Sequence, residues 1–128
     1  MSIFLTTLNR DLDSEIINVL EHLDKCLENW KVKEFKTLTD TLGNLHKIKM
    51  NSNESADVKF YKSIQEKIET IVYDLQKKYK EDLDGGNYDN YRHWLISLDR
   101  LVSLHKDIEY IFNREFKKRI EVTCKLKS

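Results

Sequence analysis

Apolar residues recur along this chain at intervals of three and four positions, the spacing that places side chains on one face of an α-helix. The first such series predicts a helix over residues 3–29, and Ser2 before it is a suitable N-cap. The members of this series are Leu5, Leu8, Leu12, Ile16, Val19, Leu23, Leu27 and Trp30.

A second series predicts a helix over residues 33–49, and a change of phase before it places a tight corner at residues 29–32. Its members are Phe35, Leu38, Leu42, Leu45 and Ile48. Residues 37–44 are mostly poor helix formers, and Gly43 alone costs about 1 kcal/mol relative to alanine. We therefore expect this helix to be the least stable part of the fold.

Two longer series occupy the rest of the chain. The polar run at residues 51–55 is a loop, and Ser55 can cap a third helix over residues 56–82. A fourth helix begins after the pair Gly85–Gly86 and runs nearly to the end of the chain. The third series comprises Tyr61, Ile64, Ile68, Ile71, Leu75 and Tyr79. The fourth comprises Tyr91, Trp94, Leu95, Leu98, Leu101, Val102, His105, Ile108, Phe112, Phe116 and Ile120, with Leu104, Tyr110 and Ile111 beside it. So wide an apolar arc predicts that the fourth helix lies centrally or offers a second side to another chain.

The composition agrees with a helical fold. The chain has no proline and three glycines among 128 residues, whereas average usage would supply about six prolines. Folds made of short strands need both residues in their turns, so we expect an all-α protein. Four amphipathic helices with short connections bury their apolar sides as an up-and-down bundle with a long C-terminal helix. We expect one domain, residues 1–128, and because the apolar pattern continues almost to the last residue, we take it to be the N-terminal domain of a longer chain.

Charge and cysteine usage narrow the partners and the compartment. Lysine plus arginine and aspartate plus glutamate each number 22, so the whole molecule has no net field to attract nucleic acid. Cys26 and Cys124 belong to no metal-binding or redox motif, and we expect free thiols. The N-terminus lacks a secretory signal pattern, and no apolar run is long enough to span a bilayer. We expect a cytoplasmic or nuclear protein.

The stretch DGGNYDNYRHW at residues 84–94 combines paired glycines with carboxylates, a histidine and aromatic rings. Its glycines follow a helix and have the wrong spacing for a phosphate-binding loop. A calcium loop that begins at Asp82 would need glycine and glutamate where the chain has Asn87 and His93. We therefore expect a corner, in which one glycine ends the third helix in a left-handed conformation and Asn87 or Asp89 caps the fourth.

The sequence contains no recognisable catalytic, cofactor or metal motif. His22 and Cys26 are four residues apart, as metal ligands on a helix can be, but nothing nearby completes the four donors of a closed zinc site. There is no nucleophile elbow, no HExxH and no paired Glu-x-x-His of a di-iron bundle. His105 lies on the apolar stripe, where we expect it to be buried or half-buried with one hydrogen bond. We predict a protein that is not an enzyme and that binds no cofactor or metal.

The distal half of the fourth helix is the best candidate for a partner-binding surface, because its apolar residues exceed what closing a bundle requires. The predicted surface consists of Tyr110, Ile111, Phe112, Phe116 and Ile120. We expect a protein–protein interaction module, or a subunit of a larger intracellular assembly, that binds partner helices. A homo-oligomer is one form of such pairing.

The last fifteen residues suggest an alternative function. They carry six basic and two acidic side chains, a net charge of +4. The basic residues are Arg114, Lys117, Lys118, Arg119, Lys125 and Lys127. The helix dipole alone favours basic residues at a C-terminus, but such a patch could also bind an anionic membrane surface or nucleic acid. In general architecture, the predicted bundle resembles the helical N-terminal domains of membrane-trafficking proteins, which implies a regulatory role as a further alternative.

Overall fold

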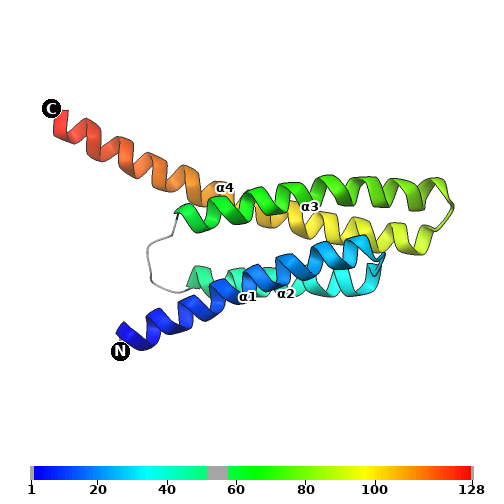
Figure 1. The fold of residues 1–128 in the computed structure, drawn as a ribbon. Coiled ribbons are helices and arrows are strands. Elements are labelled where there is room, and N and C mark those ends of the chain that lie inside the picture. The colour runs from blue at the N-terminus through cyan, green and yellow to red at the C-terminus, as the bar shows by residue number, and fades with distance from the viewer. Residues whose placement is uncertain (1, 52–57, 128) are drawn as a thin grey trace.

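The structure is a computed structural model that describes the backbone of residues 2–51 and 58–127 and the side chains of residues 12–51 and 58–113. Within the described backbone there are four helices and no strand: α1 (Ser2–Glu28), α2 (Val32–Asn51), α3 (Val58–Asp84) and α4 (Tyr88–Lys127). The predicted all-α, up-and-down bundle with a long C-terminal helix is confirmed (Figure 1).

The helices form two antiparallel hairpins that pack against each other (Figure 1). α1 packs against α2 and α3, and α4 packs against α3 and α2, so that α1 and α4 occupy opposite corners of the bundle. The α1–α2 hairpin therefore lies on one side of the α3–α4 pair. No described element covers the other side of that pair, and the candidate site lies there.

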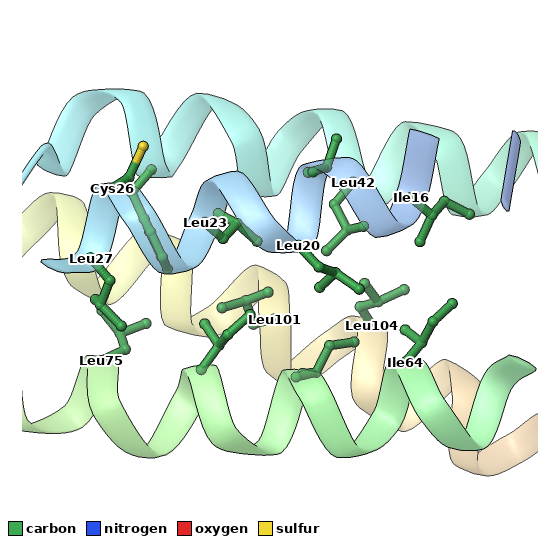
Figure 2. Close-up of a cluster of buried hydrophobic side chains, with 14 of the residues drawn as sticks. Ile16, Leu20, Leu23, Cys26, Leu27, Leu42, Ile64, Leu75, Leu101 and Leu104 are labelled. Carbon is green, nitrogen blue, oxygen red and sulfur yellow. The ribbon is translucent and has the colours of Figure 1, made fainter. Parts of the chain in front are cut away.

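Apolar side chains from all four helices fill the space between the two hairpins (Figure 2). Leu23, Leu75 and Leu101 point into this space from three different helices and are almost completely buried. Burial of a leucine or isoleucine side chain stabilises the fold by about 1.5–3 kcal/mol. The predicted helical periodicity thus produces the core that holds the hairpins together.

The buried side of α4 matches the predicted one only in part: Trp94, Leu101 and Ile108 are buried as expected. Leu104 and Ile111, which the sequence placed beside the stripe, are core residues, whereas Leu95 and Val102 of the predicted stripe are exposed. The buried positions are Trp94, Ser97, Leu101, Leu104, Ile108 and Ile111. Both series have helical spacing, and α4 buries the one that faces its two neighbours, α2 and α3. The other series remains on the outer side of the α3–α4 contact.

α3 ends at the α3–α4 corner in the predicted way. The Asn87 N–H donates to the Asp82 carbonyl at 2.8 Å, and the Gly86 N–H donates to the Leu83 carbonyl at 3.2 Å. With Gly86 at a φ of 78°, these bonds form a Schellman motif. The Asn87 side-chain oxygen then accepts from the Asn90 N–H at 3.5 Å and caps α4. The glycine-rich stretch is therefore a helix corner.

The α1–α2 corner has the same motif, with a tryptophan where glycine is usual. The Lys31 N–H donates to the Cys26 carbonyl at 2.8 Å, and Trp30 has a φ of 59°. This left-handed conformation costs a residue with a Cβ roughly 1–2 kcal/mol. Contacts of the Trp30 side chain must offset that cost.

α4 continues beyond the rest of the bundle at the end away from both corners (Figure 1). Its 40 residues correspond to a helix of about 60 Å, at about 1.5 Å per residue. The projecting part is the C-terminal segment, which contains the six residues of the predicted basic patch.

Candidate partner-binding groove

A groove runs along the outer side of the α3–α4 pair and has a volume of 340 Å³. Its lining residues are Glu69, Val72, Tyr73, Gln76, Val102 and His105. Val102 is 36% exposed and Tyr73 is 61% exposed. Leu95, seven residues before Val102 and 38% exposed, continues the apolar line along α4. Val102 of the uncovered apolar series, together with His105, therefore forms the α4 wall of this groove.

Two contacts fix the register of α3 and α4 along the groove. Towards the corner, the rings of Tyr79 and Tyr91 lie 5.9 Å apart. Further along, His105 Nε2 donates to Glu69 Oε1 at 2.9 Å, and Glu109 Oε1 lies 3.9 Å from the His105 Nδ1. His105 is half-buried and hydrogen-bonded, as the sequence predicted. The groove is thus held at one end by an aromatic contact and at the other by a polar one.

Exposed polar side chains line both rims of the groove at multiples of seven residues, which keeps them on one side of each helix. By helical spacing, the exposed residues Arg92 and Lys106 of α4 and Glu66, Tyr73 and Lys80 of α3 flank the groove-lining positions. Asp99, also exposed, lines the cleft between α2 and α4 instead. Among the described side chains, Lys106 and Glu66 form no ion pair. These charges are free to pair with groups of another molecule.

The residues of the partner-binding surface predicted from the sequence do not share one environment in the structure. Tyr110 is 67% exposed and Phe112 is partly buried against the core. Ile111 is only 1% exposed and belongs to the core, so its inclusion in an exposed surface was wrong. It points inward because it continues the series that α4 buries against its neighbours. Phe116 and Ile120 lie outside the residues whose side chains are described, as do all members of the basic patch.

Sequence reasoning missed a buried carboxylate where the two corners meet. Asp82 is 8% exposed, and its Oδ2 accepts from the Trp94 Nε1 at 2.6 Å. The Trp30 Nε1 donates to both carboxylate oxygens, at 3.2 and 3.1 Å. The ring of Phe35 packs edge-on against Trp94, and Lys78 Nζ lies 3.9 Å from the centre of the Trp30 ring. These contacts tie the α1–α2 corner to α3 and α4, and they account for the strained backbone of Trp30.

A more polar cleft of 220 Å³ lies between α2 and α4. Arg100 Nη1 crosses from α4 to donate to the Lys36 carbonyl of α2 at 3.0 Å. His46 at this cleft is buried, and burial lowers the pKa of its imidazole. Burial also raises the pKa of Tyr61, whose ring packs edge-on against His46, to about 12. Burial thus favours the uncharged form of both groups.

The pair His22 and Cys26 does not come together as a ligand set. His22 Nδ1 donates to the Asn18 carbonyl at 2.8 Å on the exposed side of α1. Cys26 is a free, buried thiol whose Sγ lies 3.9 Å from Glu34 Oε2 of α2. Burial, reinforced by the Glu34 charge, raises the pKa of this thiol. Among the side chains that the structure describes, no three His, Cys, Asp or Glu residues are placed to hold a metal ion.

Comparisons with known proteins add no functional information: no family model, no curated protein and no solved structure matches this chain. Within the described residues, none of the helices combines the length and apolar character needed to cross a membrane.

Proposed function

We propose that this protein is a non-enzymatic interaction module that receives a partner helix in the α3–α4 groove. One observation carries the proposal: after α4 has buried one apolar series in the core, a second series remains exposed along Leu95 and Val102. Scattered apolar residues on a surface need no explanation, but a line of them in a groove marks an interaction site. A helix that is apolar on two sides is suited to a second helical neighbour.

The chemistry of the groove favours a helix over other partners. Leu95 and Val102 are seven residues apart, which matches the repeat with which one helix packs on another. The groove lies between two helices, and an amphipathic helix can place its apolar side there. Charged residues at the rims would select the direction of that helix, because opposed charges stabilise one register and like charges disfavour others.

The proposed site lies closer to the corner than the surface expected from sequence. Its centre is Val102 rather than Phe116, and Ile111 is excluded because it is in the core. Tyr110 is exposed, but it lines a different cleft, between α2 and α4, with His46 and Asp107. Substitution of Val102 is therefore a sharper test than substitution of any residue in the sequence-based surface.

The experiment compares Val102→Glu with a matched control, Ile96→Glu. Ile96 is 44% exposed on α4 but does not line the groove. Each variant is first shown to keep its helicity by circular dichroism, then immobilised and exposed to an extract of the source cell with a high-salt wash. We expect a stoichiometric protein partner on the wild type and on Ile96→Glu but not on Val102→Glu. Equal retention by all three variants would contradict the proposal.

A second candidate function is supported by the projecting end of α4. This segment leaves the bundle (Figure 1), and its sequence has the net charge of +4. Binding to an anionic membrane surface through these residues would weaken steeply with salt, whereas an apolar groove contact would not. Sedimentation with phosphatidylserine vesicles at low and high salt tests it. Reversal of Lys117, Lys118 and Arg119 to glutamate should remove binding, and unchanged binding would exclude this function.

A further inference from the structure

The charges on the groove rims point to a particular occupant. We propose that the groove pairs with the same groove of a second copy of this chain, so that α4 of each copy packs antiparallel on α3 of the other. This inference rests on the proposed function of the groove and specifies its partner.

The arrangement follows from a twofold axis that runs parallel to the helices over the groove. Such a rotation places α4 of one copy above α3 of its partner and does not shift either copy along the bundle. A residue of α4 then faces, across the interface, the α3 residue of the second copy that lies at the same height along the bundle axis. The Tyr79–Tyr91 contact and the His105–Glu69 hydrogen bond define two of these levels.

The rim charges are complementary in this arrangement. At the level of the His105–Glu69 bond, Lys106 faces the second copy's Glu66, and one turn further Glu109 faces its Lys62. All four of these rim side chains are exposed within a single chain. Because the axis repeats each contact, the dimer gains every such ion pair twice.

Apolar contacts fill the space between these charges. Val102 is placed against Tyr73 of the second copy. Tyrosine combines a large apolar ring with one polar group, which explains why it is common in protein interfaces. In the single chain Tyr73 is 61% exposed and the centre of its ring lies 4.4 Å from Lys77 Nζ, and the dimer would bury more of this ring.

Other self-pairings fit less well. A parallel pairing of α4 with α4 would bring Arg92 and Lys106 each against its own copy, and like charges repel. An antiparallel pairing of α4 with α4 centred on Val102 would place Leu95 beside Glu109. The proposed arrangement has a single like-sign match, Arg92 with Lys80 near the corners.

A charge-exchange experiment tests the pairing directly. In a dimer of Lys106→Glu, two carboxylates would face each other at each 106–66 contact. In a dimer of Glu66→Lys, two ammonium groups would face each other there. We expect each variant alone to self-associate about tenfold more weakly than the wild type in sedimentation equilibrium. Mixed in equal amounts, the two variants should form a one-to-one heterodimer, because both contacts between positions 106 and 66 then join opposite charges. Lys80→Glu should instead tighten self-association.

The mixing step separates contacts between chains from effects within a chain, since a folding defect of either variant would not be repaired by adding the other. Ile96→Glu, as the control, should dimerise like the wild type. A wild-type chain that stays monomeric up to about 1 mM would overturn the inference, as would a mixture no tighter than its components. If Val102→Glu still abolishes capture of another protein in either case, the groove function stands and only self-pairing falls.

Discussion

The contact between Asp82 and the two tryptophans offers a direct test of what holds the hairpins together. Asp82→Leu keeps roughly the volume of the side chain and removes the acceptor for both indole groups. A carboxylate in the last turn of a helix is disfavoured by the helix dipole, and leucine is the more apolar residue for a buried site. By those two effects alone the variant would be more stable than the wild type. We expect the opposite.

The magnitude follows from the burial of the two donors. Trp94 is fully buried and its N–H donates to the carboxylate at 2.6 Å, so in the variant this donor can reach neither acceptor nor water. Loss of a hydrogen bond to a charged group costs about 1.5–3 kcal/mol. Trp30 is partly exposed and can bond to water instead, so its loss is smaller, about 0.5–1.5 kcal/mol. Together these predict a decrease of about 2–4.5 kcal/mol in the free energy of unfolding.

Urea unfolding followed by far-UV circular dichroism measures this change without relying on tryptophan fluorescence. The same substitution in a Trp94→Phe background is the decisive comparison, because phenylalanine has no N–H to leave unpaired. In that background, Asp82→Leu should lower the free energy of unfolding by at least about 1.5 kcal/mol less than it does in the wild type. This difference is the coupling energy expected of two groups in contact. An equal cost in both backgrounds would refute the claim that the carboxylate serves the indole N–H.

Three further predictions concern single positions. Gly43→Ala should raise the free energy of unfolding by about 0.5–1 kcal/mol, because a Cβ there meets no atom within 4 Å and glycine weakens the middle of α2; a neutral result in urea unfolding would contradict it. Gly86→Ala should lower the same quantity by about 1 kcal/mol, since φ is 78° and there is no steric clash to add to the backbone cost; equal stability would argue against the left-handed ending. Burial lowers the pKa of His46 from 6.5, so below pH 6.5 the unfolded chain takes up a proton that the folded chain resists. The free energy of unfolding should therefore decrease as the pH is lowered, by at most about 1.4 kcal/mol per pH unit from this group. Denaturation at pH 7 and about pH 5 should show that this slope is reduced in His46→Gln, and an unchanged slope would exclude His46 as its source.

Helix positions and corners could be predicted because local signals specify them. The bounds predicted for the first three helices lie within two residues of those that the structure describes. The glycine pair indicated the α3–α4 corner, where Gly86 indeed has the left-handed conformation that glycine adopts without cost. At the other corner the position was predicted correctly, but its conformation was not, because Trp30 gives no local signal for a positive φ.

The buried side of α4 and the role of Asp82 depend on contacts between distant parts of the chain. Val102 and Leu104 are both apolar and both fit a helical repeat, and only the positions of α2 and α3 decide which is buried. Asp82 is separated from Trp30 by 52 residues, so no spacing rule connects them. The candidate groove was missed for the same reason: it consists of the residues that the bundle leaves uncovered, and these are known only once the packing is known.

The two hairpins are joined on the side of the α3–α4 pair that is opposite the proposed partner groove. Asp82, Trp30 and Trp94 fasten the hairpins on the inner side of the α3–α4 pair. The groove lies on the outer side of that pair, and its register is fixed by the Tyr79–Tyr91 contact within the same hairpin. Substitutions at Val102 or along the rims should therefore change association but leave the free energy of unfolding of the single chain within about 0.5 kcal/mol of the wild type. Substitutions at Asp82 should do the reverse, so the two sets of variants distinguish the residues that hold the bundle together from those proposed to bind a partner.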